Sequence, residues 1–503
     1  MKNWLLLLIA TLIFLSVRAQ ETYSLEVKVT AGRSIYPGFL PDGRLLLFIC
    51  SRDRPEPRNQ IWPSGNNFIA AKNISDWDIA DTMHISAGNG YMQSGTVPLD
   101  AYPEGTYYLQ IAYHQNKTES RVDGPGNLYS QSLKIDLDRN RVIHLELSNM
   151  VPDHHLEDHA HLKYVELKSD VLSDWWDKSV YVKAAVLLPK TWFDQPDRKY
   201  PVRYNISGYG GRFTRANGAV REGSSFYKYW FGDEAPQVIS VYLDGEGPFG
   251  DCYQLDSENS GPYGQSLTEE LIPHIEKIYR GIGTPESRFL DGCSTGGWVS
   301  LALQVFYPDF FGGCFSYSPD PVDFEKNQLI NIYKDEYAYV NEYGYLRPVM
   351  RDTDGEPRVS MRDFVQFENT LGPSNTYLNS GGQFSAFSAL YGPRGDDGLP
   401  QPLFDPFTGK IDHQVAEHWR KYDIKHYLKE NWSVLGPKLQ GKIWIWMGDM
   451  DHFYLNPATR ALSDFLNATE NPKSDAKIRF SATEGHCSNY DQVEVIRMIG
   501  EKL

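Results

Sequence analysis

The sequence predicts an α/β domain that carries an inserted cap and follows an N-terminal β-sandwich. Apolar and polar residues alternate through about residue 150, and after residue 163 apolar strands alternate with helical segments. A stretch rich in Tyr, Gly, Pro and Asn, about 319–440, then interrupts that rhythm. Because 503 residues with 41% hydrophobic content can bury two cores, we expect two domains.

The first 19 residues have the pattern of an export signal. They contain one Lys, an uncharged apolar run over 4–15 and small residues near Ala19, where a signal peptidase would cut. The run is too short for a comfortable membrane span. We therefore predict a signal peptide over 1–19 and a periplasmic or secreted protein that is not inserted in a membrane.

The 20–150 segment reads as half-buried strands. Leu25, Val27 and Val29 alternate with polar residues, and longer strand candidates at 44–49 and 106–113 lie among Pro and Gly turns. No helical period competes with this pattern. A β-sandwich that supports the next domain or positions a substrate is the predicted architecture.

A short linker, 151–163, is rich in histidine, with His154, His155, His159 and His161 close together. Such tracts can bind metal, but their composition fits a solvated linker equally. Without a second ligand cluster, we expect no metal here. The net charge of −16 disfavours nucleic acid as a partner, and the composition leaves the oligomeric state open.

The α/β domain is expected over 164–503. Its candidate strands are 180–188, 200–206, 237–243, 288–291, 313–317, 442–447 and 477–481. A helix is predicted over 266–280, opening with Ser266 and Glu269 as a capping box, with Pro273 reducing its regularity. The 319–440 insertion is expected to be a cap that controls substrate choice.

A nucleophilic serine is predicted at Ser294. The strand at 288–291 runs into Gly292-Cys293-Ser294-Thr295-Gly296, and an apolar helix follows. This strand, G-x-S-x-G turn and helix form the nucleophile elbow of the α/β-hydrolase fold. The pentapeptide alone is weak evidence, but its structural context is present.

A base and an acid should follow in chain order, because a serine needs a base and the base needs an orienting carboxylate. His486 comes after the last predicted strand, where this fold keeps its base. The preceding strand ends near Asp449 and Asp451, and we favour Asp451, although the sequence does not show which carboxylate faces His486. No metal or organic cofactor is required.

The oxyanion donors should be two backbone N–H groups. One follows the nucleophile, at Thr295, and the other lies in the glycine-rich turn after the strand at 200–206, at Tyr209. The glycines there could instead simply make a turn.

Cys293 immediately precedes the predicted nucleophile, and Cys487 immediately follows the predicted base. Because Ser294 and His486 must come within hydrogen-bond reach, their neighbours should be close enough for a disulfide in an oxidising compartment. Two free thiols are the alternative.

These residues resemble known esterases. Cys293-Ser294, Asp451 and His486-Cys487 resemble the CS-D-HC pattern of tannases and fungal feruloyl esterases. The wider segment from Tyr200 to Pro319 resembles the esterase D-like family of bacterial α/β-hydrolases. The resemblance covers roughly two thirds of the chain and implies hydrolysis of small-molecule or carbohydrate esters, with feruloyl or acetyl esters of polysaccharides as candidates.

Two other functions stay open at this point. A β domain before an α/β-hydrolase also occurs in prolyl-oligopeptidase-like serine peptidases. A catalytically silent, carbohydrate-binding protein is the second alternative, against which the intact Ser, Asp and His set argues.

Overall fold

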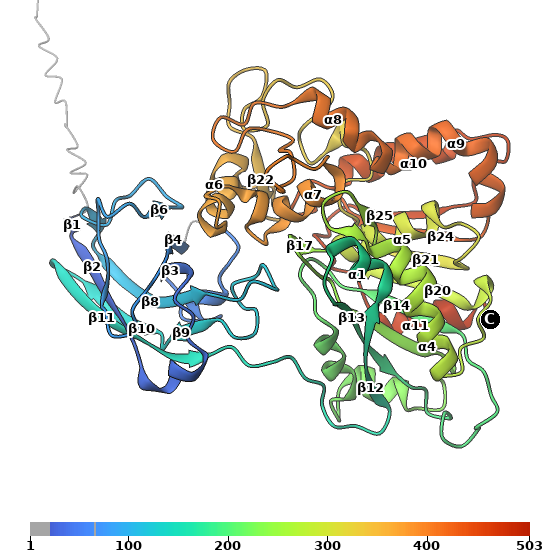
Figure 1. Ribbon diagram of the computed structural model, residues 1–503. Coiled ribbons are helices and arrows are strands. Elements are labelled where there is room, and N and C mark those ends of the chain that lie inside the picture. Colours follow the sequence, from blue (N-terminus) through green and yellow to red (C-terminus); the bar gives the residue numbers. More distant parts are fainter. Residues whose placement is uncertain (1–20, 65–66) are drawn as a thin grey trace, which may run out of the picture.

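The computed structural model describes residues 21–64 and 67–503 (Figure 1). The predicted signal peptide over 1–19 lies outside the described residues. Figure 1 shows the N-terminal strands, in blue and cyan, beside a larger α/β region coloured from green to red. Within the described part of the chain, no helix is both long and apolar enough to cross a membrane.

The N-terminal strands form a nine-stranded network in the order β5-β2-β11-β9-β8-β3-β4-β6, with β10 also paired to β8. The strands are β2 (Leu25–Ala31), β3 (Gly43–Cys50), β4 (Asn67–Ile74), β5 (Met83–Ile85), β6 (Met92–Gln93), β8 (Gly105–His114), β9 (Leu128–Ser130), β10 (Leu133–Leu137) and β11 (Arg141–Met150). A two-stranded ribbon, β1 (Thr22–Tyr23) with β7 (Tyr102–Pro103), lies beside them. Apolar residues from β2, β3, β4, β8, β10 and β11 share one core. The division into two packed sheets stays a prediction.

The larger region is built on an eight-stranded sheet in the order β12-β13-β15-β14-β20-β21-β24-β25. The strands are β12 (Leu162–Ser169), β13 (Val180–Leu187), β14 (Val202–Ile206), β15 (Ile239–Leu243), β20 (Arg288–Cys293), β21 (Gly313–Tyr317), β24 (Ile443–Gly448) and β25 (Lys477–Ser481). Strand β13 is antiparallel to both neighbours, and the strands from β15 to β25 are parallel. This largely parallel sheet is the arrangement expected for the predicted α/β-hydrolase fold.

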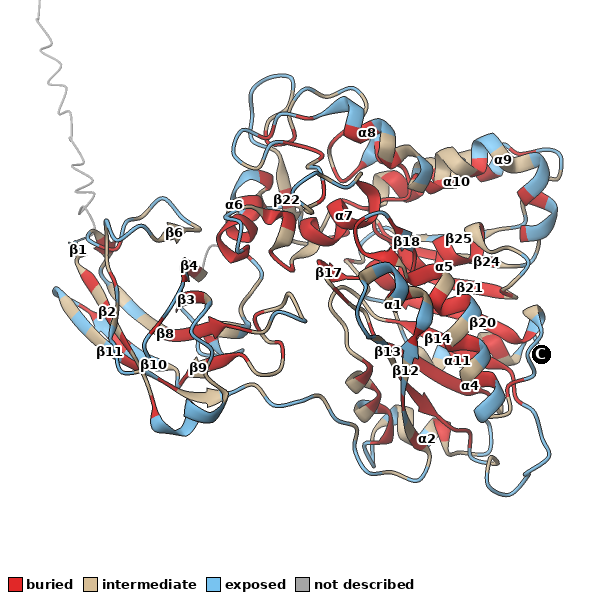
Figure 2. Ribbon diagram, in the orientation of Figure 1, coloured by how far each residue is buried: buried red, intermediate tan, exposed pale blue. Residues whose placement is uncertain are grey.

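Helices cover both faces of this sheet, and its central strands are buried (Figure 2). One face packs against α4 (Ile272–Ile278), α5 (Thr295–Phe306), α9 (Ile424–Leu439) and α10 (Asn456–Asn467). The other packs against α2 (Ser225–Trp230) and α11 (Gln492–Gly500). Strands covered on both faces read as continuous apolar runs, which is why the sequence located them. A further helix, α1 (Asp170–Trp176), follows β12.

The helix predicted at 266–280 begins earlier than expected. It starts as α3 (Tyr263–Gln265), continues through a π-helical turn over Ser266–Leu271 and ends as α4. The capping-box prediction is therefore wrong. The Ser266 hydroxyl lies inside the helix and donates to Glu270 Oε2 at 2.9 Å. A wider turn before Pro273 tolerates the missing backbone donor, so the helix is continuous but irregular.

The segment between β21 and β24 contains β22 (Pro348–Arg351), β23 (Pro357–Ser360), α6 (Met361–Leu371), α7 (Gln383–Tyr391), α8 (His413–Trp419) and α9. Figure 1 shows α6 between the N-terminal strands and the α/β sheet. Phe367 and Leu371 of α6 share an apolar cluster with Leu46 and Phe48 of β3. The N-terminal strands and this insertion are therefore packed together.

A buried cation strengthens the same contact. Arg44 of β3 is 1% exposed and donates to the Thr370 carbonyl of α6 at 3.2 and 2.8 Å. A charge buried at this depth is tolerated only when its donors are satisfied, so the contact has one preferred geometry.

Candidate active site

Ser294 stands at a sharp turn between β20 and α5. Its φ is +61° and its ψ is −126°, a combination that a residue with a side chain rarely adopts. The Ser294 N–H donates to the Tyr317 carbonyl of β21 at 3.0 Å, which fixes the turn to the neighbouring strand. The strain keeps the Ser294 side chain at the tip of the turn.

The two glycines of the G-x-S-x-G sequence are required by close packing. A Cβ at Gly292 would lie 2.4 Å from the Ile206 carbonyl oxygen, and a Cβ at Gly296 would lie 2.2 Å from the same atom. Strand β14 ends against the turn, so neither position has room for a side chain.

His486 and Asp451 are joined by a short hydrogen bond, with 2.6 Å between His486 Nδ1 and Asp451 Oδ2. Asp451 is fully buried, and its other oxygen accepts from the backbone N–H groups of Phe453 at 2.9 Å and Leu455 at 3.3 Å. Asp449 instead pairs with Arg460 near the surface. Of the two candidate acids, the structure brings Asp451 to His486.

The charge of Asp451 controls the protonation of His486. Burial by itself would lower the His486 pKa, but the nearby carboxylate of Asp451 outweighs burial and raises the pKa above its usual value of 6.5. The ring of Phe453 packs against the imidazole with 4.9 Å between ring centroids. His486 is thus held in one orientation by a carboxylate on one nitrogen and by a phenyl ring packed nearly perpendicular to the imidazole.

A disulfide joins Cys293 to Cys487, across 194 residues of sequence. It connects the residue before Ser294 to the residue after His486. The Cys487 N–H also donates to Ser318 Oγ at 3.1 Å. The described cysteines outside this bridge, Cys50, Cys252 and Cys314, are buried free thiols.

A buried ion pair lies beneath the turn. Arg203 of β14 and Asp291 of β20 are fully buried and form two parallel hydrogen bonds, at 2.8 and 2.7 Å. Asp291 also accepts from the Tyr490 hydroxyl at 2.7 Å. These contacts connect the strand before Ser294, the strand before the glycine-rich turn and the segment after His486.

The glycine-rich turn after β14, Ser207–Gly211, lies beside Ser294. A Cβ at Gly208 would lie 3.7 Å from Ser294 Cβ. The N–H of Gly210 donates to Asp251 Oδ2 at 3.1 Å, and that of Gly211 to the Gly208 carbonyl at 3.1 Å. The first predicted oxyanion donor, the Tyr209 N–H, lies in this turn between Gly208 and Gly210. The second is the N–H of Thr295, which is the first residue of α5 and therefore has no hydrogen-bond partner within the helix.

A cavity of about 350 Å³ is lined by both Ser294 and His486. Its walls are largely aromatic and include Trp62, Tyr209, Phe364, Phe384, Phe387 and Phe453. Besides Ser294 and His486, its polar lining residues include Ser207, Asp320, Gln328 and Gln383. An apolar cavity with a few polar groups can hold an organic acyl group and orient it.

Asp320 and Trp62 were not predicted. Asp320 follows β21, and its Oδ2 accepts from Tyr253, Thr295 and Gln383 at 2.9, 3.0 and 3.3 Å. Burial raises its pKa to about 6. Its place after a parallel strand could have signalled it, because polar groups at that edge commonly line a site. Trp62 comes from the segment between β3 and β4 of the N-terminal region, and nothing in its sequence neighbourhood points to this cavity.

The histidines of 151–163 are separate from this cavity's lining. His159 and His161 pack against Phe231, with ring centroids 5.6 and 5.0 Å apart. Among the described residues, no group of three or more His, Cys, Asp or Glu is arranged to hold a metal ion.

The solved structures to which this chain is similar, all at low identity, include two ferulic acid esterases and an S-formylglutathione hydrolase. A ferulic acid esterase is 15% identical over 68% of this chain and 96% of that one, with a TM-score of 0.41. An S-formylglutathione hydrolase from Agrobacterium tumefaciens is 14% identical over 69% and 98%, with a TM-score of 0.38. A ferulic acid esterase from Anaeromyces mucronatus, in complex with ferulic acid, is 14% identical over 67% and 89%, with a TM-score of 0.32. No curated protein matches the chain.

A family model assigns the chain to a protein family. The model of the Esterase family, described as "Putative esterase", matches residues 180–498, which contain Ser294, Asp451 and His486. This match spans more than half of the chain and agrees with the predicted resemblance to esterase D-like enzymes. The chain therefore belongs to the esterase family and is a carboxylic ester hydrolase.

Proposed function

We propose that this protein is an exported serine carboxylesterase with Ser294 as nucleophile, His486 as base and Asp451 as the orienting acid. The observation that carries the proposal is the 2.6 Å bond between Asp451 and His486 at a cavity that Ser294 also lines. A carboxylate, an imidazole and a serine hydroxyl at one cavity are the groups that acyl transfer requires.

The reaction would proceed in two halves. With Nδ1 bound to Asp451, Nε2 of His486 is the nitrogen available to take the Ser294 proton as Oγ bonds to the ester carbonyl carbon. The backbone N–H groups of Tyr209 and Thr295 would stabilise the resulting oxyanion. His486 then protonates the leaving alkoxide as the ester C–O bond breaks. Water, deprotonated by the same nitrogen, cleaves the acyl-enzyme and restores Ser294.

The substrate would be an ester with a bulky, planar acyl group. The aromatic walls of the cavity favour stacking on a phenolic ring, and this supports feruloyl esters over acetyl esters. The leaving alcohol could be part of a carbohydrate. Phe364, Phe384 and Phe387 come from the insertion between β21 and β24, which supports the interpretation of that insertion as a cap that sets substrate choice.

The same proposal includes the export of the protein and the bounds of its domains. The pattern over 1–19 and the disulfide between Cys293 and Cys487 support a periplasmic or secreted location. The domain bounds we propose are 20–150 for the β domain, 151–163 for the linker and 164–503 for the catalytic domain. The family match favours ester substrates over peptides.

The decisive experiment is turnover of aryl acetate, aryl butyrate and methyl ferulate by the purified, oxidised protein, with Ser294→Ala in parallel. We expect Ser294→Ala to lose at least about 10⁴-fold in kcat, because the nucleophile is removed. Ser300→Ala is the matched control, since Ser300 lies on the same helix but outside the cavity lining. Equal turnover by the wild type and Ser294→Ala would refute the proposal.

A further inference from the structure

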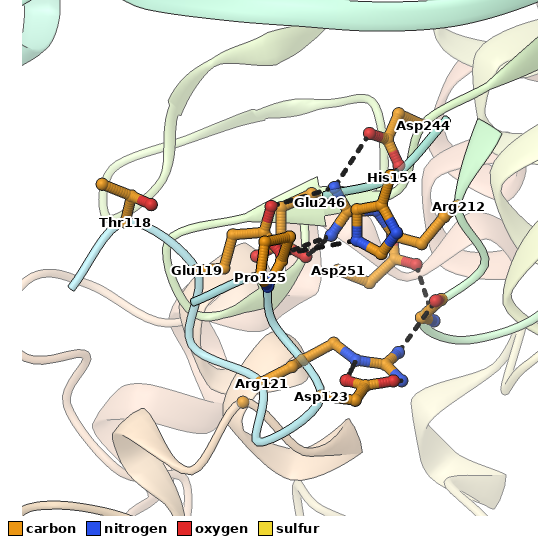
Figure 3. A network of polar contacts seen from close by, with 12 residues as sticks. Thr118, Glu119, Arg121, Asp123, Pro125, His154, Arg212, Asp244, Glu246 and Asp251 are labelled. Atoms are coloured by element: carbon orange, nitrogen blue, oxygen red, sulfur yellow. Dashed lines mark hydrogen bonds and ion pairs between the residues drawn. The ribbon is translucent and has the colours of Figure 1, made fainter. Parts of the chain in front are cut away.

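A loop of the N-terminal β domain, residues 115–127 between β8 and β9, contacts the turn beside Ser294 and is hereafter the β8–β9 loop. Figure 3 shows side chains of this loop, among them Glu119, Arg121 and Asp123, beside Arg212, Asp244 and Glu246 of the α/β domain. Arg212 follows the Ser207–Gly211 turn directly and pairs with Glu119 at 2.8 Å. The loop therefore contacts the turn that holds the proposed oxyanion donor Tyr209.

Arg121 makes the most direct of these contacts. Two of its nitrogens bind the two carboxylate oxygens of Asp123, each at 2.8 Å, which fixes the plane of the guanidinium. Its remaining nitrogen, Nη1, donates to the Gly210 carbonyl at 2.8 Å. The side chain is only 14% exposed, so these bonds face little competition from water.

The turn is shaped to receive this guanidinium. Gly210 has a φ of +70°, and a Cβ there would lie 1.6 Å from Arg121 Nη1. A residue with a side chain would be strained in this conformation and would also collide with the arginine. The glycine and the arginine thus fit one another although they belong to different domains.

Other contacts complete the hold on the turn. The Gly210 N–H donates to Asp251, so Gly210 is bound through both its donor and its acceptor. The hydroxyl of Tyr209 donates to the Gly381 carbonyl. A Cβ at Gly381 would lie 2.6 Å from the Ser120 carbonyl of the β8–β9 loop, so this loop packs closely against Gly381. The β8–β9 loop therefore contacts both Gly381, which accepts the Tyr209 hydroxyl, and Gly210, which follows Tyr209 in the chain.

The β domain also contributes a wall of the cavity. The ring of Trp62 packs against Tyr209, Phe364 and Phe453, with centroid distances of 6.1, 5.5 and 6.0 Å. These three partners belong to the glycine-rich turn, to α6 and to the segment after Asp451. Trp62 thus lines the cavity together with residues of the α/β domain and its insertion.

We propose that the N-terminal β domain completes the esterase site, with Arg121 as a positioning residue for the Tyr209 oxyanion donor and Trp62 as a residue that selects bulky aromatic acyl groups. This inference rests on the proposed function. It assigns the β domain a part in turnover and selectivity, since an oxyanion donor works only when it is held at the correct distance before the reaction.

The first test is the kinetics of Arg121→Ala and Arg121→Lys. We expect Arg121→Ala to lower kcat about 10- to 100-fold for an acetyl and a feruloyl ester alike, with KM changed less than about threefold. Arg121→Lys should recover part of the loss, because an ammonium can still donate to the Gly210 carbonyl. A kcat for Arg121→Ala within twofold of wild type would overturn the positioning role.

Arg58→Ala is the matched control. Arg58 lies in the same domain, has a similar exposed fraction of 15% and pairs with its near neighbour Glu56, and it stacks on Tyr129 of the same domain. It should leave kcat within twofold while lowering thermal stability about as much as Arg121→Ala. An equal loss of kcat in both variants would mean that domain stability, and not the turn, controls turnover.

The test of Trp62 compares two acyl groups in one variant. Trp62→Ala should lower kcat/KM for the feruloyl ester at least about tenfold more than for the acetyl ester, because only the larger acyl group reaches the wall. Trp62→Phe should lie between the two. Equal changes for both esters would overturn the selective role.

Labelling of Ser294 by a fluorophosphonate separates this inference from the proposed function. The probe forms a bond from serine oxygen to phosphorus and releases fluoride, and it needs the oxyanion donors but no ester substrate. If esters are not turned over but Ser294 is labelled, slower labelling of Arg121→Ala than of Arg58→Ala still supports the positioning role. Equal labelling rates would overturn it independently.

Discussion

The α/β sheet and the N-terminal β domain contribute to the same cavity in different ways. Ser294, Asp451 and His486 each follow a parallel strand of the sheet, β20, β24 and β25. Trp62 and Arg121 come from irregular segments of the β domain. The proposed triad therefore depends on strand ends, whereas the proposed acyl selectivity and the proposed hold on the Tyr209 donor depend on the docking of a second domain against them.

The largest effect should come from the acid at the sheet edge. Asp451→Asn should lower kcat about 10⁴-fold, because His486 loses its orienting carboxylate. Asp449→Asn, in the same loop but paired with Arg460, should stay within about fivefold of wild type. Steady-state kinetics would measure both, and a larger loss for Asp449→Asn would break the assignment of the acid.

Removing the disulfide would measure how much the stability of the sheet edge depends on a covalent link. Replacing both Cys293 and Cys487 by Ala should lower the free energy of unfolding by about 2–5 kcal/mol, because the bridge closes a long loop. Urea denaturation would measure this change. Cys314→Ala, at a buried free thiol, should cost roughly 1 kcal/mol. Equal losses would show that the bridge adds no stability.

Asp320 lines the cavity to which both regions contribute, and its burial predicts a pH dependence of stability. The pKa of Asp320 in the folded protein, about 6, exceeds its ordinary value of 3.8, so the protonated carboxyl favours the folded state at low pH. This contribution to stability is lost as pH rises from about 4 to 6. Asp320→Asn can keep an acceptor for Tyr253, Thr295 and Gln383 but cannot ionise. Its stability relative to wild type should rise by about 1–3 kcal/mol over that window. Parallel pH curves of unfolding free energy would contradict this.

The smallest expected effect is a shift in the pH profile. His486 must be neutral to act as base, so kcat/KM should rise with pH and reach half its plateau above pH 6.5. In the residual activity of Asp451→Asn, this midpoint should fall, because burial lowers the His486 pKa once the carboxylate charge is gone. A midpoint unchanged by the substitution would show that another group limits the rate.

The sequence located most strands of the sheet, because buried parallel strands are short apolar runs between turn residues. It missed β4, whose continuously buried run covers only residues 68–71, whereas that of its located neighbour β3 covers 44–50. It also placed the start of the helix at Ser266 too late, because a serine followed by a glutamate three residues on resembles a cap even inside a helix.

What the sequence determined by itself was the order of chemical groups along the chain. The G-x-S-x-G turn, the residues after the last two strands and the two flanking cysteines are local patterns, and the parallel sheet brings strand ends to one edge. The tertiary structure alone decided which carboxylate meets His486 and which side chains enclose the cavity. Asp449 and Asp451 are two residues apart, so only the path of the loop separates them. Trp62 and Arg121 reach the site through the packing of one domain on another, and no local pattern encodes that contact.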